Sequence, residues 1–541
     1  MKVPPNQRVD GRAGGYRPDI DGIRAIAVLA VVMFHAFPTL LTGGFIGVDV
    51  FFVMSGFLIT RILRDGVTVR TFSFSEFYER RIRRLVPALV VVVAATALVG
   101  LIILPPGDLK DLGRSIAPSM LFTANYHFAH KTGYFAPADD VRPLLHLWSL
   151  AVEEQFYIVW PLVIWLGARA PQTLFPKLAF SVALAVAIAL SLGADEIAAR
   201  HDPLAAFFHT PLRAWEPLTG AAIAVWWTRP IRAAWMAELL AAAGLAAILV
   251  SLFVLNAATP VPGLAALPAC LGAGLLLQAG RFGGRTWVAR GLSWPPVVYV
   301  GALSYSFYLW HWPVLTFLRL GSPAEPPATV MAAGVVLSLA LAALSFRFIE
   351  RPYRRRPQNG LSRRALFAVA IAAVALLAGL GEILSADGGL RHRVHGVALA
   401  ADTAERDFPT TGACSAPTLG VAGLAAPTHC AFGAARPGPP DLVLLGDSEA
   451  EAWEAGVADF ALARGLKGQL VNVPACPPVI GVDERDPFGQ PAPCPLRPPQ
   501  RPGPGPDRRR PPHSRPGARR PLGSLRSGPR RRPPQRLSGR P

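Results

Sequence analysis

The chain has 541 residues, of which 52% are hydrophobic and only 16% are charged, and its formal net charge is +19. This composition excludes an ordinary soluble domain and indicates an integral membrane protein. Most of the charge lies in one segment, because residues 497–541 contain fourteen arginines and a single acidic residue. The rest of the chain is only moderately basic, and we therefore expect no nucleic-acid partner.

The first apolar segment contains two ionisable residues. Arg24 and His35 lie eleven positions apart, so they share one face of a helix, about 16 Å apart along its axis. An ionisable side chain at membrane depth costs about 2.5 kcal/mol or more and normally faces the protein interior, where it marks a functional path. The alternative is a snorkelling arginine and a structural histidine that a neighbour satisfies.

Eleven segments are long enough to cross a bilayer, although the sixth is short and contains Arg213 and Glu216. They lie near residues 20–40, 45–63, 85–104, 145–167, 174–193, 211–228, 235–255, 261–280, 297–318, 327–349 and 364–384. Basic residues gather in every second loop, which predicts a cytoplasmic N-terminus. An odd number of spans then leaves everything after about residue 385 outside. We expect an all-α polytopic membrane protein of about 10–11 transmembrane helices.

The external segment contains four of the five cysteines, which fits an oxidising compartment. The pairs Cys414–Cys430 and Cys476–Cys494 are one of three possible connectivities. The last segment, residues 497–541, consists mostly of Arg, Pro, Gly and Ser, cannot bury a core and is expected to be disordered. A polybasic arm and an out-of-frame reading of a GC-rich gene are two open explanations for it.

Polar residues also recur in six blocks within or beside the spans. These blocks are GGFIGVDVFFVMSGFLIT (43–60), FYERRIRRLVPAL (77–89), HLWSLAVEEQFYIVWP (146–161), RAWEPLTG (213–220), LSYSFYLWHWP (303–313) and SFRFIERPYRR (345–355). Together with Arg24 and His35 they resemble the acyltransferase 3 family of membrane acyltransferases, especially its bacterial O-antigen O-acetylase branch, over residues 16–355. The resemblance implies an acyl-coenzyme A donor on the cytoplasmic side and delivery of the acyl group to an external glycan.

The resemblance also implies that Arg24 and His35 take part in activity. A neutral imidazole suits the base of an acyl transfer, and a guanidinium matches the geometry of a donor phosphate. Further candidates for substrate binding are Arg80, Arg81, Arg83, Arg84, Glu153, Arg213 and His311. The four arginines of residues 80–84 would alternatively set only the topology. Glu153 would either relay protons or neutralise Arg213, and His311 would either pack in an interfacial aromatic belt or join the site.

The segment DLVLLGDSEAEAW, residues 441–453, predicts a strand, a tight turn and a helix. Ser448 would then lie at the end of the strand, where a helix N-terminus stabilises an oxyanion. This segment resembles the first block of an SGNH hydrolase domain, in which the serine is the nucleophile. The family's Asp-x-x-His base motif is missing, so we expect a truncated, incomplete α/β domain that is largely inactive.

The expected organisation has four parts: an acyltransferase membrane domain (1–356), a linker with the final span (357–384), a truncated SGNH-like periplasmic domain (385–496) and the tail (497–541). The expected function is transfer of an acyl group, with acetyl foremost, from acyl-coenzyme A to hydroxyls of an extracytoplasmic polysaccharide such as lipopolysaccharide O-antigen. The expected location is the bacterial inner membrane, with the lipid bilayer around the spans. No metal and no tightly bound cofactor are expected. A transporter that exports a glycan or acyl carrier, and an inactive remnant, are the alternatives.

Overall fold

The computed structural model describes residues 16–130, 142–169, 177–229, 231–256, 258–282, 286–322, 325–354, 361–395, 431–446 and 448–472. These residues fall into two compact units, a helical unit before residue 396 and a small α/β unit after residue 430. The cysteine pairs and the basic tail lie outside the described residues.

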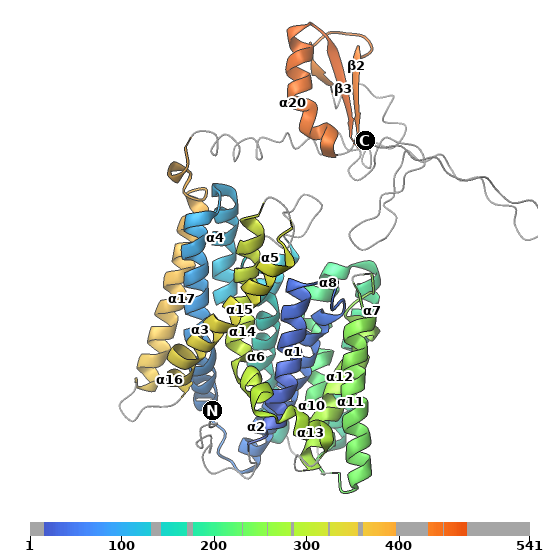
Figure 1. The fold of residues 1–541 in the computed structure, drawn as a ribbon, viewed down its shortest axis with the longest axis vertical. Helices are drawn as coiled ribbons and strands as arrows, with labels where there is room; N and C mark the ends of the chain where they lie inside the picture. The colour runs from blue at the N-terminus through green and yellow to red at the C-terminus, as the bar shows by residue number, and fades with distance from the viewer. Residues whose placement is uncertain are drawn as a thin grey trace, which may run out of the picture. The chain divides into compact units, whose positions relative to one another are not determined.

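The first unit is built from helices (Figure 1). The helices are α1 (Pro18–Ala36), α2 (Gly47–Thr68), α3 (Phe74–Ile103), α4 (Pro106–Met120), α5 (Ala124–Ala129), α6 (Leu147–Arg169), α7 (Lys177–His201), α8 (Pro203–Phe208), α9 (Thr210–Arg213), α10 (Trp215–Trp226), α11 (Ala234–Val254), α12 (Gly263–Ala279), α13 (Trp287–Leu292), α14 (Pro295–Leu320), α15 (Ala328–Ser345), α16 (Arg351–Arg354) and α17 (Arg363–Ala386). The described residues of this unit also form the short helical turns η1 (Gly44–Ile46), η3 (Gly280–Phe282), η4 (Phe346–Glu350) and η5 (Arg391–Arg393).

The predicted spans all coincide with helices. In the described part of the chain, seven helical segments are long and apolar enough to cross a membrane, and they include α2, α3, α6, α7, α11, α15 and α17. The other four expected spans are α1, which begins with charged residues, α14, which is rich in aromatic and hydroxyl side chains, and the shorter α10 and α12. The all-α polytopic fold class is confirmed, and the protein is a membrane protein.

Helix α1 and helix α14 form one of the closest pairs in the unit, and they run in the same direction. Gly301 of α14 lies against the backbone of α1, where an added Cβ would come within 1.8 Å of the Asp21 carbonyl oxygen. Small residues of this kind let two membrane helices approach until their backbones touch. Further along both helices, the same close packing brings His311 against His35.

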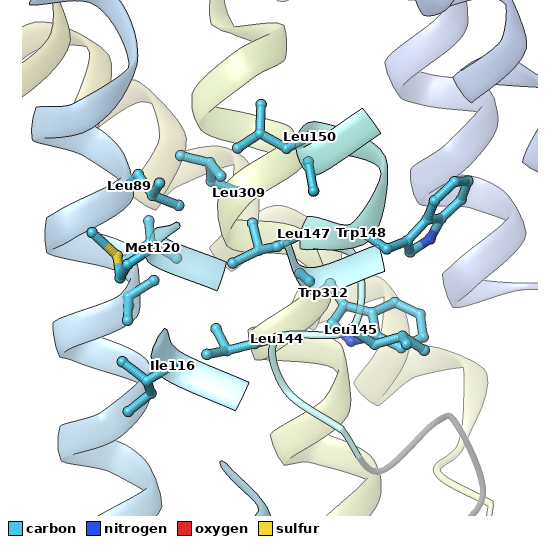
Figure 2. Close-up of a cluster of buried hydrophobic side chains, with 14 of the residues drawn as sticks. Leu89, Ile116, Met120, Leu144, Leu145, Leu147, Trp148, Leu150, Leu309 and Trp312 are labelled. Atoms are coloured by element: carbon cyan, nitrogen blue, oxygen red, sulfur yellow. The ribbon is translucent and has the colours of Figure 1, made fainter. Parts of the chain in front are cut away.

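A large apolar cluster fixes the start of α6 between α4 and α14. Figure 2 shows Leu144, Leu147 and Leu150 beside Ile116 and Met120 of α4, with Leu309 and Trp312 of α14 in the same cluster. Each of these side chains is at most 5% exposed. Large apolar side chains that are buried and closely packed hold the neighbouring polar residues in fixed positions. The cluster therefore forms a rigid wall beside His311.

In its described residues, the second unit contains a three-stranded sheet and one helix. Its elements are β1 (Ala431–Gly433), β2 (Leu442–Gly446), α20 (Ser448–Ala463) and β3 (Lys467–Asn472). The strand order is β1-β3-β2, with β2 parallel to β3 and β1 antiparallel to it. Phe432, Ala461 and Leu470 form its small core. The α/β class expected for this unit is confirmed.

Candidate active site

His35 lies near the C-terminal end of α1, and its imidazole faces α14. Its Nδ1 atom is 3.0 Å from Nε2 of His311, and the two rings are nearly parallel, with centroids 5.3 Å apart. Trp312 closes another side of the ring, edge-on at 4.5 Å between centroids. The imidazole of His35 therefore contacts protein on these sides, as expected for an ionisable group at this depth.

His311 is fully enclosed. None of its surface is exposed, and its Nδ1 atom lies 2.6 Å from the backbone oxygen of Tyr308, one turn earlier in α14. The interpretation of His311 as packing in an interfacial aromatic belt is therefore wrong, because such a belt lies at the surface of the bundle. Since helix α14 packs on α1, His311 points inward, toward His35.

A third histidine completes this group. His146 lies just before α6 and presents its ring edge-on to His311, with centroids 5.8 Å apart. Its backbone oxygen accepts a hydrogen bond of 2.8 Å from the Tyr308 hydroxyl, which also contacts Ser149 Oγ at 2.6 Å. We call His35, His146, His311 and Tyr308 the histidine cluster. Within the described ranges, no group of His, Cys, Asp and Glu has the arrangement of a metal site.

Arg24 lies eleven residues before His35 on α1, at the opposite end of the helix. Its guanidinium pairs with Asp21 at 3.2 Å, and the Tyr16 hydroxyl donates to the other oxygen of the same carboxylate at 2.8 Å. Partial burial and this hydrogen bond raise the pKa of the Tyr16 phenol. The positive charge of Arg24 also acts on Arg84 and Arg354, so three guanidiniums share the electrostatic field at this end of the helix.

The four arginines at the start of α3 differ in their partners. Arg80 pairs with Glu76, Arg81 with Glu154 and Arg83 with Glu79. Among the described residues, Arg84 forms no ion pair. Three of the four expected phosphate-steering charges are therefore already neutralised by carboxylates, and Arg84 is the one whose charge is left over. Arg24 and Arg354 are also paired, with Asp21 and Glu350 respectively, and we call Arg24, Arg84 and Arg354 together the arginine cluster.

Arg213 pairs with carboxylates other than Glu153. Its guanidinium contacts Asp49 of α2 at 2.9 Å and Glu216 of α10 at 2.8 Å, and all three side chains are buried. The interpretation of Glu153 as the partner that neutralises Arg213 is therefore wrong. This ionic network ties α2, α9 and α10 together. Because both carboxylates occupy the Arg213 guanidinium, Arg213 acts here as a structural ion-pair partner.

Glu153 instead accepts two hydrogen bonds on one carboxylate oxygen. Ser55 of α2 donates at 2.6 Å and Tyr157 donates at 2.5 Å. Arg81 lies over the ring of Tyr157, 3.7 Å from its centroid. Ser149, Glu153 and Tyr157 are spaced by four residues, so they follow one face of α6. This face leads from the histidine cluster toward the arginines at the start of α3.

The sequence matches known families in two places. A family model described as an acyltransferase domain, that of the acyltransferase 3 family, matches residues 17–347, which is more than half of the chain. The chain belongs to the acyltransferase 3 family. A second model, described as an SGNH domain fused to such acyltransferase domains, matches residues 413–498. Both resemblances expected from the motifs are thereby confirmed.

Relatives of this acyltransferase 3 chain are named as O-acetyltransferases. The chain is 33% identical to the peptidoglycan O-acetyltransferase OatA of Listeria monocytogenes over 357 residues, which are 63% of this chain and 56% of OatA. The Bacillus subtilis protein YrhL, provisionally described as a peptidoglycan O-acetyltransferase, is 33% identical over 64% of this chain and 56% of YrhL. A provisionally described Staphylococcus aureus O-acetyltransferase is 30% identical over 65% of this chain and 59% of that protein. The chain thus matches little more than half the length of these relatives. No solved structure matches.

In the SGNH unit, the structure places Ser448 where the motif predicts it, two residues after the end of β2 and at the first residue of α20. The structure describes the backbone position of Ser448 but not its side chain. Among the described strands, β2 lies at the edge of the sheet, and its Val443 and Leu445 are 52% and 43% exposed. In the described residues, only one helix covers this sheet, so one of its faces has no helical layer.

The acyltransferase 3 unit contains site residues that sequence reasoning did not assign. His146 and Arg354 lie in two of the recognised blocks, but nothing in the sequence indicates which distant helix they approach. In the sequence, Asp49 is a lone acid in an apolar run, and in the structure it is buried beside Arg213. A lone acid in one span and a lone arginine in another would have been the available signal for this pair.

Proposed function

We propose that the chain is a membrane O-acyltransferase that moves an acyl group, acetyl foremost, from acyl-coenzyme A to a hydroxyl of an extracytoplasmic polysaccharide. The observation that carries this proposal is the arrangement on α1, with the histidine cluster at one end and the arginine cluster at the other. The names of the relatives support an O-acetyl group. They also favour peptidoglycan over lipopolysaccharide O-antigen as the acceptor.

The arginine cluster suits the donor. Coenzyme A carries phosphate groups at one end and the acyl thioester at the end of a long flexible arm. Guanidiniums bind phosphate oxygens through short charge-assisted hydrogen bonds. When the phosphates of coenzyme A bind to Arg24, Arg84 and Arg354, its long arm would extend along α1 toward His35, about 16 Å away.

The histidine cluster suits the chemical step. The imidazole of His35 would take the proton of the acceptor hydroxyl while the hydroxyl oxygen attacks the thioester carbonyl carbon. The carbon–sulfur bond then breaks, and the thiolate leaves and recovers the proton. The new oxygen ester and free coenzyme A account for every atom of the two reactants.

Glu153 would relay the proton in this step, from the face of α6 that also carries Ser149. It lies one helical turn from Ser149, whose hydroxyl contacts Tyr308 of the histidine cluster. A carboxylate that accepts from both Ser55 and Tyr157 is well placed to pass a proton along a row of hydroxyls. The proton-relay interpretation of Glu153 is the one that its contacts favour.

The proposed location is the bacterial inner membrane, with the N-terminus and the arginine cluster in the cytoplasm and the SGNH unit in the periplasm. The basic residues of every second loop support this orientation. The proposal assigns no step to Ser448, which in an intact SGNH domain would receive the acyl group as a relay nucleophile.

The test uses inside-out membrane vesicles that carry the full chain. 14C-labelled acetyl-coenzyme A is added outside, at the cytoplasmic face, and peptidoglycan fragments or O-antigen are enclosed inside. Covalent label on one of these glycans supports the enzyme, and the labelled glycan identifies the acceptor. The variant His35→Ala should abolish labelling while the protein remains in the membrane fraction, whereas His209→Ala, outside the cluster, should not. Transport of label without a covalent product, or unchanged labelling with His35→Ala, would overturn the proposal.

A further inference from the structure

The hydrogen bonds of His311 determine where its hydrogen lies. Its Nδ1 atom is 2.6 Å from the backbone oxygen of Tyr308. A carbonyl oxygen only accepts, so Nδ1 must carry the hydrogen. In a neutral imidazole the other nitrogen, Nε2, then has a lone pair and no hydrogen. His311 is therefore a donor toward its own helix and an acceptor toward α1.

This assignment passes to His35. Nε2 of His311 lies 3.0 Å from Nδ1 of His35, and since Nε2 accepts, Nδ1 of His35 must donate. A neutral His35 consequently has no hydrogen on Nε2, which is the nitrogen that does not contact His311. Among the described residues, no carboxylate forms an ion pair with either ring, so the hydrogen bonds to the Tyr308 backbone and between the two rings determine the tautomers.

The rest of the surroundings hold His35 in this orientation. Arg319 of α14 donates to the backbone oxygen of His35, and Trp312 packs edge-on against its ring. His311, Trp312 and Arg319 all lie on α14, so one helix fixes both the backbone and the ring. Second-layer contacts of this kind orient a reactive imidazole and select its tautomer.

We propose that His311 is a positioning residue that selects the tautomer of His35, so that the free Nε2 of His35 is the atom that accepts the proton of the acyl acceptor. The expected effect on the rate rests on the proposed function, whereas the tautomer of His35 follows from the hydrogen bonds alone. It replaces a substrate-binding role for His311, which is fully enclosed.

The tautomer is measured directly by 15N NMR of the detergent-solubilised full chain labelled at histidine. The eleven histidines are resolved by subtraction, with His35→Ala identifying the signals of His35. We expect a protonated Nδ1 and an unprotonated Nε2 on His35 in the wild type. His311→Gln should preserve this pattern, because its carboxamide oxygen reaches the position of Nε2, whereas His311→Leu should abolish it. A wild-type His35 protonated on Nε2 would overturn the proposal.

Kinetics supply the second readout. His311→Leu should lower kcat about 100-fold with little change in the KM for acetyl-coenzyme A, and His311→Gln should restore most of the rate. His209→Leu is the matched control, and melting temperatures verify that each variant is folded. Equal rates in His311→Leu and wild type would contradict the positioning role. A wild type without any acyl transfer would overturn the proposed function instead, while the NMR result would still decide the tautomer.

Discussion

Arg213 of α9 donates to the Asp49 carboxylate of α2 at 2.9 Å, although 164 positions of chain separate the two residues. Glu216 engages the same guanidinium, so one buried cation serves two carboxylates. The variant Arg213→Met would leave both acids buried without a partner. We expect it to lose about 3–5 kcal/mol of stability, measured as a lower melting temperature in detergent.

The control for this variant is Arg200→Met. Arg200 pairs with Glu196 on the same helix, and its side chain is 63% exposed. An exposed pair of this kind contributes about 0.5 kcal/mol or less. Similar melting temperatures for the two variants would show that the buried network does not hold α2, α9 and α10 together.

The proposed donor site predicts different effects for two neighbouring arginines of α3. Arg84 has no ion-pair partner in the described residues, while Arg80 is half-exposed and paired with Glu76. Losing a charged hydrogen bond to phosphate costs about 1.5–3 kcal/mol, so Arg84→Gln should raise the KM for acetyl-coenzyme A about 10-fold or more. Arg80→Gln should leave it nearly unchanged. A reversed order in steady-state kinetics would exclude Arg84 from the donor site.

Glu153 predicts a loss of rate that is separable from a loss of stability. The variant Glu153→Gln keeps the shape of the side chain and an oxygen for Ser55 or Tyr157, but it removes the charge that accepts a proton. We expect kcat to fall about 100-fold with the melting temperature nearly unchanged. Glu196→Gln, on α7, is the control. A lower melting temperature at full kcat would mean that Glu153 only supports packing.

Close packing at Gly301 predicts that a larger residue there separates α1 from α14. A valine would place its Cβ within 1.8 Å of the Asp21 carbonyl oxygen, and overpacking of this kind costs about 1–3 kcal/mol or more. Gly301→Val should therefore insert into the membrane but lose acyl transfer. Gly193→Val is the control, because nothing lies within 4 Å of its Cβ position. Full transfer by Gly301→Val would contradict the need for this contact.

The SGNH unit predicts an esterase test. A serine without its base is a poor nucleophile, so the wild type and Ser448→Ala should hydrolyse p-nitrophenyl acetate at the same background rate. The acetyl label transferred by the membrane unit should also be equal in the two proteins. Faster ester hydrolysis by the wild type would show that Ser448 has a base that the sequence motifs do not reveal.

The sequence predicts the helices well and their partners poorly, for a physical reason. Apolar runs decide which segments enter the bilayer, and the spacing of Arg24 and His35 decides that they share a helix face. The spacing does not show that His311 lies beside His35, because that contact joins residues 276 positions apart. The contact of Arg213 with Asp49 is hidden for the same reason, because only helix packing selects Asp49 over Glu153. The contact with Glu216 is visible in the sequence, because the two residues are only three positions apart.

The pairing of α1 with α14 also determines when the reaction centre comes into being during synthesis. His35 leaves the ribosome with the first helix, but His311, Trp312 and Arg319 follow only after some 276 further residues have been made. Until then the opening helix must wait in the bilayer without its partner, so newly made protein stays inert until nearly the whole membrane unit has been inserted.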